Sequence, residues 1–190
     1  MPAAKRGERK HQILQVIAEM LQNPKGEKIT TAALAKRLDV SEAALYRHFA
    51  SKAQMFEGLI EFIEQTVFGL VNKISTEEES GAKQVPAILG MLLGFAEKNP
   101  GMTRVLIGDA LVNEDDRLQA RINQLYDRIE ATLKQCLRLA ATQGGEAQQD
   151  PTAHANILLC YVIGRWHQYA KGGFKRLPTE LWEKQWPLLM

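Results

Sequence analysis

The sequence has few of the residues from which catalytic and metal centres are built. Among its 190 residues are two cysteines and four histidines, and their spacing matches no metal-ligand motif. A glycine-rich phosphate loop and a nucleophile motif are lacking as well. The sequence therefore gives no indication of an enzyme, and we expect neither a metal nor another cofactor.

Long hydrophobic runs are also lacking. The longest mostly apolar run, residues 85–96, is far shorter than the roughly 20 residues that a membrane-spanning helix needs. No signal-peptide pattern precedes Cys136 and Cys160, and both cysteines lie inside apolar helical patterns without paired spacing. These features are typical of a cytoplasmic protein with no membrane anchor.

The net charge is only +2, but the charges are unevenly distributed. Residues 1–60 contain ten Lys and Arg against six Asp and Glu, whereas residues 61–190 contain fourteen against sixteen. A basic end on a near-neutral body indicates a nucleic-acid-binding unit in the N-terminal third.

Apolar residues recur at helical spacing and strict alternation is absent, which predicts an all-α fold. The predicted helices cover residues 8–22, 31–38, 42–49, 52–75, 85–98, 103–111, 114–142 and 151–170. The acidic and small stretch 76–81 is the candidate linker. We therefore divide the chain into a helix-turn-helix DNA-binding domain (1–51), a connecting helix (52–75) and a helical domain for dimerisation and partner binding (76–190).

The helix-turn-helix pattern lies within residues 30–52. Two short predicted helices carry apolar side chains at i, i+4 spacing, which can lock the helices together. Ser41, just before the second helix, is a typical N-cap residue. The apolar pairs are Leu34 with Leu38 and Leu45 with Phe49.

The side of the second short helix that faces away from this core is small and then basic. Ala43 and Ala44 would allow a close approach to base edges, and Arg47 can donate to guanine O6 and N7 together. The other DNA-binding candidates are Ser41 and, as phosphate contacts, Thr30, Thr31, Tyr46, His48 and Lys52. The alternative for His48 is a histidine that caps the helix end.

These residues resemble the TetR family of repressors. The family's Leu-Tyr-x-His-Phe-x-x-Lys signature is complete in residues 45–52, and residues 30–35 and 40–44 extend the likeness. A narrower resemblance, to nucleoid-occlusion factors, covers the whole chain. It is carried by residues 41–49, 59–64, 99–101, 116–119, 128–130, 174–175 and 186–188.

The narrower resemblance implies that a DNA-bound dimer on the nucleoid engages FtsZ, the tubulin-like division protein, and disrupts its polymers. The effector would then be a protein, and no small-molecule ligand is expected. Gly90 and Gly94 are four residues apart, which predicts close helix packing there rather than an open cavity. The rival interpretation is a TetR-like transcriptional repressor that a small-molecule inducer releases from its operator.

Two long C-terminal helices predict a homodimer. One carries a heptad-like seam and the other is apolar on nearly all sides, so that pairing two copies would bury both. Two recognition helices related by a two-fold axis require a palindromic DNA site. The alternative is that the seam is only an intramolecular core. The expected interface residues are Leu118, Ile122, Leu125, Ile129, Leu158, Tyr161 and Val162.

A partner-binding surface is expected around Phe62. Phe62 lies roughly 110° from the centre of the apolar stripe of its helix, at 100° per residue. The side chain would then be exposed among polar neighbours, unless another helix covers it. Lys98 and Asn99, beside Gly94, can complete this surface, although helix capping is the alternative for both. The stripe comprises Phe56, Leu59, Ile60, Ile63, Val67, Leu70 and Ile74.

Overall fold

Helices are the only regular elements in the part of the chain that the computed structural model describes, residues 6–23, 29–144 and 150–190. The all-α prediction is thus confirmed. The elements are α1 (Arg6–Leu21), α2 (Thr31–Arg37), α3 (Glu42–Tyr46), α4 (Lys52–Glu77), α5 (Gly81–Lys98), α6 (Pro100–Leu106), the 3-10 helix η1 (Asp109–Leu111), α7 (Asp116–Thr142), α8 (Pro151–Lys171) and α9 (Trp182–Leu189).

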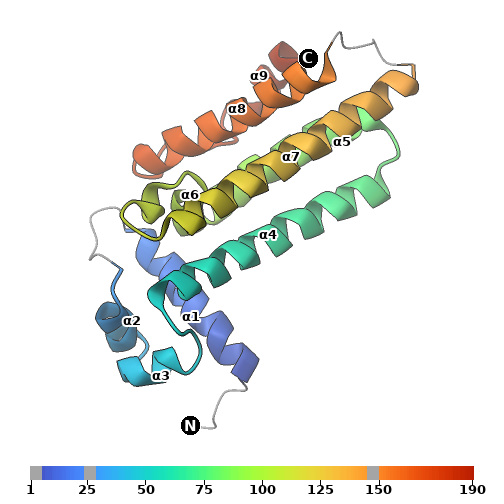
Figure 1. The fold of residues 1–190 in the computed structure, drawn as a ribbon. Coiled ribbons are helices and arrows are strands. Elements are labelled where there is room, and N and C mark those ends of the chain that lie inside the picture. The colour runs from blue at the N-terminus through green and yellow to red at the C-terminus, as the bar shows by residue number, and fades with distance from the viewer. Residues whose placement is uncertain (1–5, 24–28, 145–149) are drawn as a thin grey trace.

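The helices α1, α2 and α3 form a small unit at the lower end of the molecule (Figure 1). α2 and α3 contact each other, and α1 contacts both α2 and the first part of α4. The apolar pairs of the helix-turn-helix pattern are 0–9% exposed and form the core of this unit, together with Ile13 and Ile17 of α1. The periodicity of the two short segments therefore predicted the part of this core that α2 and α3 contribute.

The long helices α4, α5, α7 and α8 lie side by side above that unit (Figure 1), and α7 contacts the other three. The predicted dimer seam lies in the middle of this stack. Leu118, Ile122, Leu125, Ile129, Leu158 and Val162 are at most 1% exposed in the single chain. A side chain without accessible surface cannot contact a second copy, so the seam is the intramolecular core, and the expected interface must be corrected. Tyr161 is half-buried, and its hydroxyl donates to Gln185 Oε1 at 2.8 Å.

α8 is not buried on all sides, contrary to what its apolar run predicts. Its inner face is fixed by Trp166, whose Nε1 donates to the Leu92 carbonyl at 3.1 Å. Its outer face is exposed, with Ile157 reaching 57%. The exposed small and apolar residues, spaced three or four apart, are named the α8 stripe: Ala153, Ile157, Cys160 and Gly164.

Several element boundaries differ from the predicted ones. α4 runs to Glu77 and α5 begins at Gly81, so the candidate linker shrinks to residues 78–80. Gly81, where α5 begins, lies directly on α7, and a Cβ there would stand 2.4 Å from the Cys136 carbonyl oxygen. α6 begins at Pro100, since proline suits the first helical position. The apolar stripe of α4 omits Leu70, which is 39% exposed, and includes Val71 instead.

The segment after α8 folds back over α8. The buried guanidinium of Arg165 donates to the carbonyls of Leu177 at 2.8 Å and Pro178 at 3.1 Å. In α9 the Trp182 ring contacts those of Tyr161 and Trp186. None of the described helices has the length and apolar character needed to cross a bilayer.

Gly90 and Gly94 do not mark close packing between helices. A Cβ on Gly94 would meet no atom within 4 Å, and one on Gly90 would meet Trp182 Nε1 at an ordinary 3.4 Å. The close approach falls at Gly101 instead, where a Cβ would stand 1.9 Å from the carbonyl oxygen of Ala18. α6 therefore touches α1 backbone to backbone.

Replacing Gly101 by Ala should lower the free energy of unfolding by about 1–3 kcal/mol, because the two helices must separate to admit the methyl group. The matched control is Gly94→Ala, which adds the same methyl group in open space within a helix and should raise stability by about 0.5–1 kcal/mol. Urea unfolding followed by circular dichroism measures both. Equal stability of the two variants would contradict the close α1–α6 contact.

Candidate nucleic-acid interface

The start of α2 is held by two threonine hydroxyls. Thr30 is the N-cap, and its Oγ1 accepts from the Ala33 N–H at 3.1 Å. Thr31 Oγ1 donates to Glu42 Oε2 at 2.6 Å and so joins the start of α2 to the start of α3. Both predicted phosphate contacts therefore also fix the relative position of the two helices.

The turn between α2 and α3 depends on Asp39, whose φ of +52° lies in the left-handed region. The Asp39 N–H donates to the Lys36 carbonyl at 3.3 Å, and the Val40 N–H donates to the Ala35 carbonyl at 3.0 Å. This is a Schellman motif, and aspartate is among the few non-glycine residues that readily take its left-handed position. The helix-turn-helix pattern predicted a turn before Ser41, but it did not single out Asp39 as the residue that shapes it.

α3 presents the predicted reading surface. Ser41 Oγ accepts from the Ala44 N–H at 3.2 Å, which confirms its capping role. Because Leu45 is buried against the core, Ala43 and Arg47 are exposed and Ala44 is half-buried. Tyr46 is 46% exposed at the side of this surface. The outward side of α3 therefore carries small alanine side chains, followed by the long cationic side chain of Arg47.

His48 and Lys52 are less free than the sequence pattern suggested. His48 is half-buried, and its Nδ1 has no hydrogen-bond partner among the described residues. Lys52 forms an ion pair with Glu114, in which the two side chains are 24% and 15% exposed. Glu114 lies far away in the sequence just before α7, so no local signal could have revealed this pairing.

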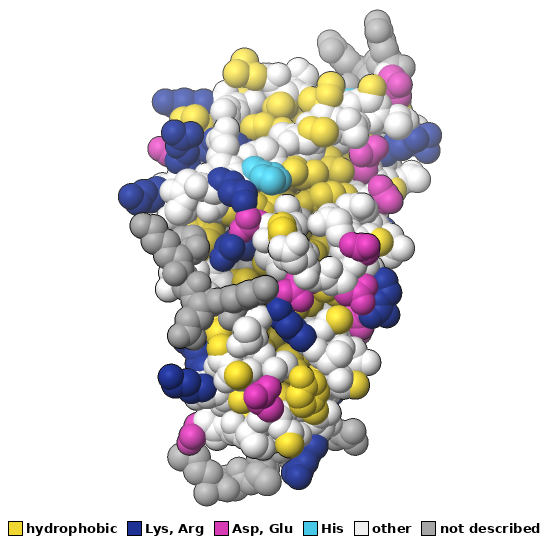
Figure 2. All heavy atoms as spheres, turned by 60° about the vertical axis from the view of Figure 1, so that its left-hand side comes forward, with side chains coloured by type: hydrophobic (Ala, Val, Ile, Leu, Met, Phe, Trp, Pro, Cys, Tyr) yellow, Lys and Arg dark blue, Asp and Glu magenta, His cyan; other side chains and the backbone are white. Residues whose placement is uncertain are grey.

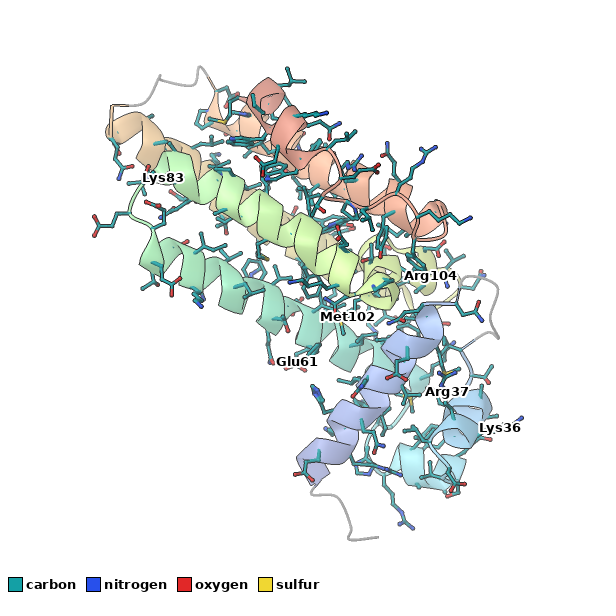
Figure 3. The ribbon with its side chains drawn as sticks, turned by 180° about the vertical axis from the view of Figure 1, so that it is seen from behind. Lys36, Arg37, Glu61, Lys83, Met102 and Arg104 are labelled. Carbon is teal, nitrogen blue, oxygen red and sulfur yellow. The ribbon has the colours of Figure 1, made fainter. Side chains whose placement is uncertain are left out.

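Further positive charge lies beside the reading surface. Lys36 and Arg37 are exposed at the end of α2, where Figure 3 labels them. Consecutive basic residues in the last turn of the first short helix were the available signal for them. Such charges attract the DNA backbone without reading sequence.

A second surface lies where α1 crosses α4 and α6. It is next to the helix-turn-helix of α2 and α3, which is named the reading unit. Two neighbouring hollows of about 280 and 290 Å³ share His11, Leu14 and Phe62, and together they are named the α1–α4 groove. Figure 3 labels Met102 on α6 and Glu61 on α4, which line one hollow each. The other lining residues are Gln15, Ala18, Glu19, Gln22 and Asn99 in the first hollow and Gly7, Lys10, Phe49, Gly58 and Gln65 in the second.

The four predicted partner-binding residues are only partly brought together. Phe62 is half-buried in the groove, where its ring meets His11 edge-on at 5.2 Å between centroids. Asn99 lines the same hollow, and its Nδ2 donates to the Phe95 carbonyl at 2.8 Å, which is the capping role of the alternative interpretation. Lys98 and Gly94 lie on α5 outside the residues that line the groove.

A helix-turn-helix exposed on a small N-terminal unit, with a larger helical body behind it, defines the class of TetR-like DNA-binding regulators. A TetR transcription regulator from Haloarcula marismortui shares this fold with a TM-score of 0.80, at 14% identity over 94% of both chains. FadR from Bacillus subtilis, solved with stearoyl-CoA, has a TM-score of 0.76, at 14% identity over 94% of this chain and 96% of that one. The model for bacterial regulatory proteins of the tetR family matches residues 18–59.

Comparisons of the helical body and of the full chain identify the family more narrowly. The model for the tetracyclin repressor-like, C-terminal domain of SlmA-like proteins matches residues 81–190. Nucleoid occlusion factor SlmA of Alteromonas mediterranea is 52% identical over 98% of this chain and 96% of its own length. The SlmA of a Marinomonas species is 49% identical over 97% and 94%. The chain belongs to the SlmA family of nucleoid occlusion factors, which are DNA-binding regulators and not enzymes.

Proposed function

We propose that the chain acts as a nucleoid occlusion factor in the cytoplasm. Bound as a dimer to palindromic chromosomal sites, it binds FtsZ and disrupts its polymers, so that division does not occur over the nucleoid. One observation carries this proposal. α1 packs against α2 with one side and lines the α1–α4 groove with another, so the candidate DNA-reading helices and the groove are neighbours.

Arg47, the C-cap residue of α3, is the side chain best suited to read a base. It is exposed beyond two alanines, and a guanidinium can donate two parallel hydrogen bonds to guanine. Tyr46 next to it, and Lys36 and Arg37 at the end of α2, are also exposed and suit phosphate contacts, which set the register. Sequence preference would then depend mainly on one side chain.

Replacing Arg47 by Ala should weaken binding to a selected operator by about 10- to 100-fold, the value of one bidentate base contact, and relax the base preference at one position. Arg138→Ala, which removes an exposed arginine from α7 instead, serves as the control for lost charge. Fluorescence anisotropy at one fixed salt concentration measures both. An equal loss on all DNA sequences would identify Arg47 as a phosphate contact.

Dimerisation is supported by the α8 stripe. Figure 2 shows hydrophobic side chains gathered on the upper part of the face in view, at the height of α8 and α9, with charged groups around them. The stripe is small and apolar, and Asn156 beside it donates to Glu130 Oε2 of α7 at 2.9 Å. Pairing α8 and α7 of two copies about a two-fold axis would bury the stripe in a four-helix interface. The two recognition helices would then enter successive major grooves.

In solution, the chain should scatter light as a particle of about twice 21.3 kDa. Ile157→Asp should shift the mass toward that of one chain, because it places a charge in the middle of the apolar stripe. Leu188→Asp, at an 82% exposed leucine on α9, should leave the mass unchanged. A wild-type mass near 21.3 kDa would refute the dimer, and an unaffected Ile157 variant would place the interface elsewhere.

The α1–α4 groove is the surface that we assign to FtsZ. Phe62 offers a half-buried aromatic face, and Met102 and Leu14 add apolar surface within the same hollow. Amide and carboxylate groups from Gln15, Glu19 and Asn99 surround this apolar part. An aromatic residue within a polar rim is the usual composition of a strong protein contact.

Phe62→Ala should leave operator affinity unchanged and weaken FtsZ binding by about 2 kcal/mol, or roughly 30-fold, as for a central aromatic contact. The control is Phe68→Ala, which truncates a half-buried aromatic of α4 outside the groove, beneath Arg128 at 3.8 Å. Pelleting of FtsZ polymers with and without operator DNA provides the measurement. If the wild-type protein leaves the polymers intact, the inducer-controlled repressor becomes the better interpretation.

A further inference from the structure

A chain of polar contacts links the end of α8 to the end of α1. Lys171, the last residue of α8, forms an ion pair with Oδ1 of Asp109 in η1. The other carboxylate oxygen, Oδ2, accepts from Arg104 Nε of α6 at 2.6 Å. Arg104 Nη1 then donates to the carbonyl of Leu21, the last residue of α1, at 3.3 Å. These three side chains are named the α8–α1 relay.

The middle of the relay is sheltered from water. The Arg104 and Asp109 side chains are 20% and 18% exposed, whereas that of Lys171 is 59% exposed. Burial raises the pKa of the Asp109 carboxyl, but the hydrogen bonds from Lys171 and then Arg104 outweigh burial and hold the pKa below its usual value. The guanidinium also lies at the C-terminal end of α1, where carbonyls lack helical partners and a cation is favoured.

The backbone around the relay allows little freedom. Gly101 holds α6 directly against α1, and α6 also contacts α8. Gly108, between α6 and η1, has a φ of +76°, in the left-handed region that favours glycine. Figure 3 shows Arg104 on α6 close to the end of α1. α6 and η1 thus lie between α8 and α1, and the relay connects them to both helices.

We propose that Asp109 is a positioning residue that fixes the angle between α1 and α8 and so sets the spacing of the two recognition helices. The proposal rests on the proposed dimeric binding to a palindrome. α8 carries the stripe that would lie at the two-fold axis, and α1 carries the reading unit. A change in the relay therefore alters the preferred distance between half-sites and leaves the base contacts of α3 unchanged.

The test compares an operator with two versions in which one base pair is inserted or removed between the half-sites. The wild-type protein should prefer the original spacing by about tenfold, the cost of a typical mismatch in a site. Asp109→Asn should reduce this ratio to about threefold or less, and Asp109→Glu, which keeps the charge, should restore it. The ratio is the readout because a uniform change in affinity, from stability or net charge, cancels in it.

Two lysines provide a matched pair. Lys171→Gln removes the exposed end of the relay and should reduce the spacing ratio in the same direction as Asp109→Asn. Lys175→Gln removes the same charge four residues later, from an exposed lysine without a hydrogen bond or ion pair in the described part of the chain, and should leave the ratio unchanged. The double variant of Asp109 and Lys171 should lose no more than Asp109→Asn alone, because both act through one contact.

Thermal melting shows whether each variant is folded. If Asp109→Asn does not fold, Lys171→Gln, which changes an exposed side chain, provides the same test of the relay. A folded Asp109→Asn with the wild-type spacing ratio overturns the proposal, as does an effect of Lys175→Gln equal to that of Lys171→Gln. A wild-type protein that binds single half-sites as tightly as the palindrome overturns the dimeric function itself. The two failures are therefore distinguishable.

Discussion

The backbone contact between α1 and α6 determines where the DNA-reading unit sits on the body. α1 carries the core of the helix-turn-helix on one side, through Ile13 and Ile17, and lies on α6 with another. At the closest point, Gly101 leaves no room for even one methyl group beside Ala18. The direction in which α3 faces thus depends on how tightly α6 holds α1.

α1 also forms one wall of the groove beside the reading unit. Because α1 crosses α4 at an angle (Figure 1), the two helices diverge and leave hollows lined by side chains from both. His11 and Phe62 meet where the two hollows join. The reading surface and the groove therefore share α1 as a common wall, and neither keeps its shape if α1 moves.

α4 provides the second connection, since one continuous helix runs from the reading unit into the body. Its outer side is joined to α7 by several polar contacts. Arg121 pairs with Glu64 at 2.9 Å and donates to the Glu57 carbonyl at 3.4 Å, and Arg128 lies over the Phe68 ring. The Arg121 and Glu64 side chains are only 31% and 16% exposed, and the spacing of these contacts along both helices fixes how α4 lies against α7.

The sequence by itself determined the features that depend on near neighbours. The helices, the cap at Ser41 and the buried faces of the helix-turn-helix follow from side chains within four residues of one another. Tertiary structure decided what each face packs against. An amphipathic pattern indicates that a face is buried but not what covers it. We therefore predicted a dimer interface at the seam of α7, and the structure shows that this seam is the core of the single chain. The Lys52–Glu114 pair, the groove around Phe62 and the contacts of Asp109 join residues far apart in the chain, and only the packed helices bring them together.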